Sequence, residues 1–276
     1  NGVDRREPLL FPAMVTSSAA MLACNRLRIS VPGRLLVDNL AMTLSAGEFL
    51  AVLGQNGSGK SLTLHTLAGL RDRDSGDIEL GGQPLDAMKR IDVARRLALL
   101  PQYTDDVFPA TVLDTALAGR HPHLRALQWE TATDRDIARR SLEAMDLAEL
   151  EHRDVGTLSG GERRRLAIAE VLAQAPGIYL LDEPTNHLDP QHQLKVLQVF
   201  AEHANAGATV VASLHDVNLA ARYADRCLLL FGDGRWKLGA TRDVLNSSLL
   251  SELYDTPMEP VPWRGRELFV AAGSAP

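Results

Sequence analysis

Cysteine, aromatic side chains, long apolar runs and net positive charge are all scarce or absent in this sequence. Of 276 residues only two are cysteines and 5% are aromatic, while the formal net charge is −6. No run approaches the ~18 consecutive apolar residues that a membrane-spanning helix requires. The acidic balance argues against a nucleic-acid-binding protein, which usually shows a basic excess. Cys24 and Cys227 both lie in apolar stretches, so we expect two buried thiols, as in a reducing compartment, rather than a disulfide.

What is present is an ordinary globular composition, with 45% hydrophobic and 23% charged residues. The length suits one large domain, or a core with a subdomain. Residues 1–20 lack the apolar centre of a signal peptide. We interpret them as a disordered extension, either added or upstream of the native start, with Met21 as an alternative start. Residues 21–276 are expected to form a single domain.

The stretch 54–61, GQNGSGKS, fits the phosphate-binding P-loop pattern G-x-x-x-x-G-K-[ST]. An apolar strand precedes it over 48–53, and a helix with an end near Gly69 follows it. Glycines let successive N–H groups point inward at a helix N-terminus, which favours phosphate. Lys60 is expected to reach the β- and γ-phosphates, and the Ser61 hydroxyl to hold Mg²⁺. The predicted nucleotide-binding residues here are Gly54, Gln55, Asn56, Gly57, Ser58, Gly59, Lys60, Ser61 and Leu62.

Strand and helix patterns alternate along the rest of the chain. Two β-prone stretches, 22–31 and 35–44, predict a hairpin before the P-loop strand. Further strands are expected over 77–80, 97–100, 178–182, 208–213 and 226–231, and helices over 91–96, 190–204 and 216–224. This alternation is typical of a parallel sheet covered on both faces.

The pattern changes from about residue 104. Residues 111–119 and 131–146 have helical spacing without a convincing strand, so we predict an inserted helical subdomain over about 104–160. The predicted fold is therefore α/β: a P-loop NTPase core with a mixed, mainly parallel sheet, an antiparallel β subdomain and an inserted helical subdomain.

Two adjacent carboxylates end the apolar run over 178–181. The carboxyl ends of strands in open α/β sheets are where ligands bind. Asp182 fits the acid that holds Mg²⁺, directly or through water. Glu183 is placed to polarise water for attack on the γ-phosphate. The alternative is a pair of solvated acids at a strand end.

A second glycine-rich motif, LSGGE, covers 158–162 and precedes a helix over 163–174. Ser159 and Glu162 have the spacing of a capping box, which would make them no more than a well-capped helix start. The same geometry also provides a second site for an anion at a helix N-terminus.

The order and spacing of the P-loop, LSGGE, Asp182, Glu183 and His215 resemble an ATP-binding cassette (ABC) domain over about residues 22–245. The resemblance implies an ATPase that uses Mg²⁺ and forms a head-to-tail homodimer. In that dimer the signature of one copy caps ATP on the P-loop of the other, and its residues here are Ser159, Gly160, Gly161 and Glu162. Glu162 stands where many members have glutamine.

The resemblance also assigns roles one residue at a time. Gln102 is similar to the glutamine that senses Mg²⁺ and the membrane partner. Asp189 resembles the aspartate that bridges the two sites, and His215 the histidine that contacts the γ-phosphate. The expected catalytic residues are thus Glu183, His215 and Gln102, and the expected metal-binding residues are Ser61, Gln102 and Asp182.

One position departs from the family pattern. An aromatic residue usually precedes the P-loop by about two dozen residues and stacks on adenine, and Val31 stands there instead. Since stacking of a ring on a base is worth about 1–3 kcal/mol, this change affects the selection of adenine rather than the binding of phosphate.

Two other patterns favour ordinary structure over chemistry. The arginines at 139–140 and 163–165 are expected on solvated helix faces or in protein contacts, rather than on nucleic acid. His121 and His123 have no nearby third ligand, so we expect a loop between helices rather than a metal site.

Three kinds of ABC protein remain open. The first is the ATPase subunit of an importer, the second an exporter's separate ATPase subunit, and the third a soluble mechanical ATPase acting on ribosomes or DNA. Residues 119–124, 182–189 and 215–224 resemble ATPases of bacterial importers for ferric siderophores, haem and cobalamin, and we lean to cobalamin or siderophore. That resemblance implies two membrane-spanning permease subunits, an extracytoplasmic binding protein, a peripheral location on the cytoplasmic face of the inner membrane, and no nucleic acid.

Overall fold

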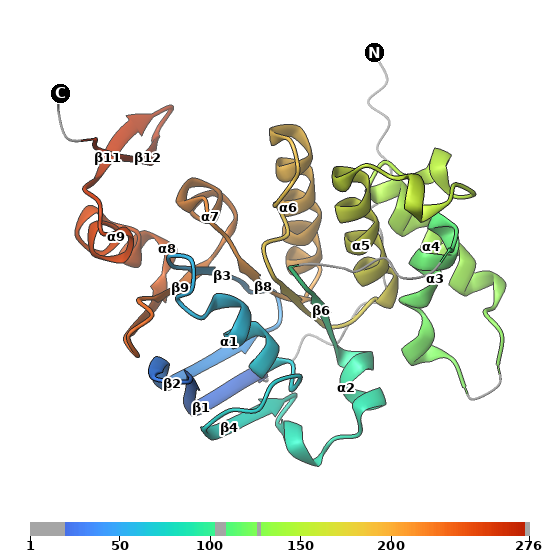
Figure 1. Ribbon diagram of the computed structural model, residues 1–276, viewed down its shortest axis with the longest axis horizontal. Coiled ribbons are helices and arrows are strands. Elements are labelled where there is room, and N and C mark those ends of the chain that lie inside the picture. Colours follow the sequence, from blue (N-terminus) through green and yellow to red (C-terminus); the bar gives the residue numbers. More distant parts are fainter. Residues whose placement is uncertain (1–19, 103–108, 126–127, 274–276) are drawn as a thin grey trace.

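The computed structural model describes residues 20–102, 109–125 and 128–273 (Figure 1). Residues 1–19 of the expected extension lie outside the described residues. A six-stranded sheet in the order β10-β9-β3-β8-β7-β6 forms the centre. All neighbouring pairs are parallel except β10 with β9, so the predicted mixed, mainly parallel sheet is confirmed. Its strands are β3 Phe49–Leu53, β6 Leu97–Leu100, β7 Ile178–Leu181, β8 Thr209–Ser213, β9 Arg226–Leu230 and β10 Trp236–Ala240.

An antiparallel sheet in the order β2-β1-β4-β5 forms the second layer. It consists of β1 Ala20–Val31, β2 Arg34–Ser45, β4 Ser75–Leu80 and β5 Gln83–Pro84. The predicted hairpin is confirmed, since Val31 pairs with Arg34 across the turn at Pro32 and Gly33. Gly33 has φ +77°, a conformation that glycine adopts at little cost.

Helices cover both faces of the central sheet. The expected helices are present at the expected places, and Cys24 and Cys227 are buried free thiols. The segment His121–His123, expected as a loop, is a single 3-10 turn. The α-helices are α1 Lys60–Leu67, α2 Arg90–Arg96, α3 Val112–Ala118, α4 Ala132–Ala144, α5 Gly160–Gln174, α6 Pro190–Asn205, α7 Val217–Tyr223, α8 Thr241–Val244 and α9 Ser247–Tyr254.

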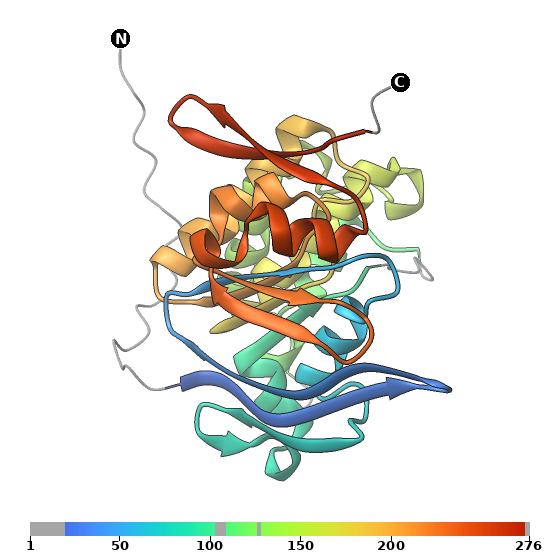
Figure 2. The same ribbon diagram turned by 90° about the vertical axis from the view of Figure 1, so that its left-hand side faces the viewer.

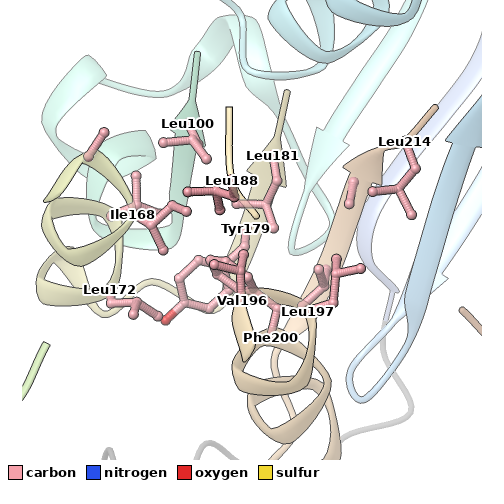
Figure 3. Close-up of a cluster of buried hydrophobic side chains, with 14 of the residues drawn as sticks. Leu100, Ile168, Leu172, Tyr179, Leu181, Leu188, Val196, Leu197, Phe200 and Leu214 are labelled. Atoms are coloured by element: carbon pink, nitrogen blue, oxygen red, sulfur yellow. The ribbon is translucent and has the colours of Figure 1, made fainter. Parts of the chain in front are cut away.

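Alternate side chains of the central strands enter two separate apolar cores. On β3, Leu50 and Val52 face α1 and the antiparallel sheet, whereas Ala51 and Leu53 face the core shared with α5, α6 and α7. Figure 3 shows this second core, in which the Tyr179 ring packs edge-on against Phe200 with ring centroids 5.4 Å apart. Burial on both faces explains why the parallel strands are continuous apolar runs.

The helices α3, α4 and α5 pack together on one side of the molecule, opposite the antiparallel sheet (Figure 1). Capping boxes start α3 at Thr111 and α4 at Thr131. A buried ion pair joins Arg120 to Asp134, with the Arg120 Nε and the Asp134 carboxylate 3.0 Å apart. These contacts make a compact helical unit in the region where we expect the inserted subdomain, and the bounds 104–160 stay a prediction.

Sequence patterns missed the elements after residue 235. Strands β11 Met258–Trp263 and β12 Arg266–Ala271 form a separate hairpin next to α9 (Figure 2). Pro260 and Pro262 conceal β11, because proline is depleted in strands and tolerated mainly at edges. The Asn218 side chain of α7 holds the hairpin, since it bonds both the N–H and the carbonyl of Phe269.

None of the described helices has the length and apolar character needed to cross a membrane. Among the described residues there is also no group of three side chains suited to hold a metal ion by themselves, His121 and His123 included.

Candidate functional site

The P-loop connects β3 to α1 at the carboxyl edge of the central sheet. A Cβ on Gly54 would lie 2.5 Å from the carbonyl oxygen of Leu230, so only glycine fits against β9 there. Gly59 has φ +103° and immediately precedes α1. The sequence therefore uses glycine where the backbone turns sharply into the helix, and the first N–H groups of α1 are left facing the loop.

Lys60 lies buried at the start of α1, with only 5% of its surface exposed. Its ammonium group donates to the carbonyl oxygens of Gly54 at 2.8 Å and Gln55 at 3.2 Å, which directs the charge along the inside of the loop. Burial lowers the pKa of Lys60, while the negative charges of Glu183 and Asp182 oppose that shift. The loop therefore presents a positive charge to its own concave side.

Glu183 follows β7 and is fixed by two side chains from other segments, Gln102 and His215, and by Asn186 of its own turn. Gln102 Nε2 donates to its carboxylate at 2.8 Å, and His215 Nε2 lies 2.7 Å from the other oxygen. The Asn186 amide donates to the same carboxylate oxygen as Gln102. The Glu183 backbone has φ +49°, and its N–H donates to the Ser213 hydroxyl at 2.8 Å. A carboxylate that is only 6% exposed is thus held in one orientation.

Asp182 lies one residue earlier and is completely buried. One of its carboxylate oxygens accepts a hydrogen bond of 2.7 Å from Ser213 Oγ. The other oxygen, Oδ2, is buried and bonds to no other described residue. An unpaired buried carboxylate oxygen is costly unless a ligand meets it.

A cavity of about 390 Å³ lies between the P-loop and the ends of β6, β7 and β8. Half of the predicted site residues line this cavity, whereas Gly54, Gln55, Ser58 and Asp182 do not line it directly. Its lining residues are Asn56, Gly57, Gly59, Lys60, Ser61, Leu62, Gln102, Glu183, Asn186 and His215.

The signature residues and Asp189 are not part of this cavity. Ser159 and Glu162 form the predicted capping box of α5, with the Ser159 N–H donating to the Glu162 carboxylate at 2.7 Å. Gly160 and Gly161 form its first turn. Asp189 caps α6 in the same way and accepts from the His192 N–H at 3.0 Å. Ser159, Gly160 and Asp189 are exposed, and both helix starts lie outside the P-loop cavity of the same chain.

Residues 37–186 match the family described as ABC transporter. The chain belongs to the ABC transporter family. Over 221 residues it is 46% identical to the hemin import ATP-binding protein of Deinococcus radiodurans, covering 78% of this chain and 83% of that one. It is 36% identical over 234 residues to the petrobactin import ATP-binding protein of Bacillus anthracis, covering 84% and 86%.

Solved ABC structures agree with this assignment. A protein described as a metal-chelate type ABC transporter in an inward-facing conformation has a TM-score of 0.80 and 31% identity, covering 92% of this chain and 98% of that one. An ATP-binding cassette in its ADP conformation has a TM-score of 0.74 at 20% identity, covering 86% and 98%, and shows the shared fold alone. The chain is thus an ABC ATPase, which hydrolyses ATP for transport, and the ABC assignment from its motifs is confirmed.

The structure adds three residues that the motifs did not indicate. Asn186 lies one turn after Glu183 and lines the cavity. Its position in the NHLD stretch, just after the two carboxylates, could have indicated that it belongs to the site. Arg34 is exposed, but its Nε donates to the Gly232 carbonyl at 2.8 Å, and a Cβ on Gly57 would lie 3.9 Å from its Nη1. Arg164 is only 6% exposed and reaches the ends of β6 and β7. Of the two settings expected for this arginine run, a solvated face and protein contacts, Arg164 has the second, because its guanidinium is enclosed by backbone carbonyls.

Proposed function

We propose that this ABC ATPase powers the import of a metal-chelate nutrient, and that the nutrient is haem. The supporting observation is the similarity to ATP-binding proteins named for hemin and petrobactin import, together with the metal-chelate type transporter structure. It would bind two permease subunits at the cytoplasmic face of the plasma membrane and receive cargo through an extracytoplasmic binding protein. This proposal replaces our preference for cobalamin or a siderophore.

The proposed chemistry follows from the cavity. The P-loop N–H groups and Lys60 bind the phosphates, because they already converge on its concave side. Glu183 orients and polarises the water that attacks the γ-phosphate. His215 and Gln102 fix the Glu183 carboxylate, and His215 also reaches the terminal phosphate. Each group is held before ATP arrives, so little reorganisation is needed at the moment of reaction.

We further propose that Mg²⁺ binds with the nucleotide. The buried Oδ2 of Asp182, one residue before Glu183, fits a hard cation or its water, and Ser61 and Gln102 line the cavity that Glu183 also lines. When bound, Mg²⁺ neutralises charge on the phosphate oxygens. These oxygen donors come from three segments, which agrees with a site completed by the phosphates rather than by protein alone.

The exposed position of the signature supports a head-to-tail homodimer as the active unit. Ser159 and the first turn of α5 do not line the P-loop cavity of their own chain, so a second copy would have to supply the ATP that they cap. Asp189 would then lie between the two sites.

Deletion and complementation test the importer proposal. Cells that lack this chain should fail to grow on haem as their iron source, and a copy carrying Glu183→Gln should not restore growth, whereas the native sequence should. In a reconstituted complex, ATP hydrolysis should rise when haem-loaded binding protein is added. Normal uptake of haem, siderophores and cobalamin in the deletion strain, with the protein found on ribosomes or DNA, would favour the soluble mechanical ATPase. Loss of efflux instead would favour the exporter subunit.

A further inference from the structure

Beyond the proposed substrate, the structure assigns Arg164 as a positioning residue that joins the signature helix to the two strand ends carrying Gln102 and Glu183. The inference rests on the proposed roles of Gln102 and Glu183 in hydrolysis. It concerns neither the P-loop nor the signature serine.

The guanidinium occupies the place where β6 and β7 separate. The two strands are paired in parallel up to Leu100 and Leu181, and among the described residues the last backbone bond between them runs from the Asp182 N–H to the Leu100 carbonyl at 2.9 Å. Past that point, Nη1 of Arg164 donates to the Pro101 carbonyl at 2.7 Å and to the Gln102 carbonyl at 3.3 Å. The side chain thereby continues the connection that the ladder no longer makes.

The other nitrogen makes the matching contacts on β7. Nη2 donates to the carbonyls of Asp182 at 2.6 Å and Glu183 at 2.8 Å. One planar group therefore satisfies four carbonyls on two strand ends, which a lysine ammonium cannot do from a single point. The charge is retained, because burial lowers the Arg164 pKa only to about 10, with Asp182 and Glu183 opposing the shift.

This arrangement has a mechanical consequence. Arg164 lies in α5, little more than one turn after the cap at Ser159, so the signature and Arg164 belong to one continuous helix. The same guanidinium holds the backbone from which Gln102 reaches the Glu183 carboxylate at 2.8 Å. Displacement of the signature by a partner's nucleotide would therefore alter the Gln102–Glu183 geometry in the chain that supplies the signature.

The test compares Arg164→Met and Arg164→Lys with Arg165→Met in the full-length protein. Arg165 is the matched control, because it is the next residue of α5 and also bonds two carbonyls, those of Met145 and Asp146, away from the cavity. Arg164→Met should lower kcat roughly 10- to 100-fold, the effect of lost hydrogen bonds to a charged group. The Kd for ATP should change less than about threefold, and Arg164→Lys should recover part of kcat.

A double-mutant cycle with Gln102→Ala decides between positioning and general destabilisation. If Arg164 acts through Gln102, the double variant should be about as slow as the slower single variant. The inference is overturned if the two single-variant losses in kcat multiply in the double variant. It is also overturned if Arg165→Met lowers kcat as much as Arg164→Met does. Rates are compared below the unfolding temperature of each variant, and Arg164→Lys serves if Arg164→Met does not fold. If Glu183→Gln hydrolyses ATP at the native rate, the role of Glu183 fails, whereas the cycle reports on Arg164 and Gln102 directly.

Discussion

Glu183 is the residue on which the site converges. Its carboxylate accepts from Gln102 and Asn186 and lies 2.7 Å from His215, and its backbone is held in a left-handed conformation by the turn after β7. A residue so fixed can orient a water molecule without rearranging, which is the requirement for a general base that acts in a transition state.

Replacing Glu183 by glutamine should abolish most hydrolysis and preserve ATP binding. The amide keeps the shape and some hydrogen bonds of the carboxylate but cannot accept a proton, and loss of a general base costs about 10²–10⁴-fold in rate. Phosphate release and ATP binding are measured on the same preparation. Lys60→Ala is the contrasting variant, since it should weaken binding itself by removing a phosphate contact. Turnover at the native rate by Glu183→Gln would show that another group activates water.

The absence of an aromatic ring at Val31 should make the choice of base loose. Val31 is partly buried against the apolar core and offers no ring for stacking. GTP should therefore support turnover within about tenfold of ATP, a difference of about 1.4 kcal/mol. Competition between the two nucleotides measures this, and a preference above roughly a hundredfold would mean that other groups read adenine.

At the scale of one element, α5 combines exposed and buried residues that have different roles along its length. Its first turn is the exposed signature, its second turn carries Arg164 into the strand ends, and Glu170 lies farther along among the packed helices. Burial raises the pKa of Glu170 to about 7. The Glu170 carboxyl group is therefore protonated over a wider pH range in the folded state than in the unfolded chain.

Glu170→Gln should stabilise the protein above neutral pH. The pKa of Glu170 is higher in the folded state than the ordinary value of 4.5, so folding binds a proton and stability falls as pH rises from about 5 through 7. A glutamine at this position does not titrate, so it removes this contribution to the pH dependence of stability. The gain in unfolding free energy should reach about 2–3 kcal/mol at pH 8 and shrink below about 1 kcal/mol at pH 5. Denaturant titrations at both pH values measure it, with the exposed Glu149→Gln as control. An equal gain at both pH values would contradict the mechanism.

At the scale of the whole molecule, the separation of P-loop and signature is the dominant feature. Both are complete within one chain, yet the cavity contains only the P-loop side. A monomer would thus bind nucleotide on one surface and leave the α5 N-terminus without a phosphate to cap.

Mixing two inactive variants should restore part of the activity if the active unit is a head-to-tail dimer. Ser159→Arg places a bulky side chain at the α5 cap, and it also removes a cap worth about 0.5–2 kcal/mol. Lys60→Ala damages the P-loop. In a mixed dimer one interface carries both changes and the other carries neither. Each variant alone should be inactive, and the mixture should hydrolyse ATP. If mixed dimers form and stay inactive, one intact interface is not sufficient for turnover.

Much of this protein can be predicted from its local sequence. The P-loop glycines, the strand before Asp182 and the capping spacing at Ser159 each depend on residues a few positions apart, where backbone conformation and hydrogen bonding are decided locally. The central strands could be predicted for the same reason. A strand that is buried on both faces is a continuous apolar run, which can be recognised without knowing the neighbouring strands. The family resemblance carried the roles of Gln102 and His215 and agrees with their place in the cavity.

The tertiary structure decided what depends on partners distant in sequence. Arg164 looks like one member of an ordinary basic run, but its guanidinium bonds to carbonyls at the ends of β6 and β7, which are 63 and 18 residues away in the sequence. The strand β11 is concealed by its prolines and exists because β12 and Asn218 of α7 support it. Local sequence sets the conformation of a loop or a helix start, whereas the burial of a charge and the pairing of an edge hairpin depend on which distant segments pack around them.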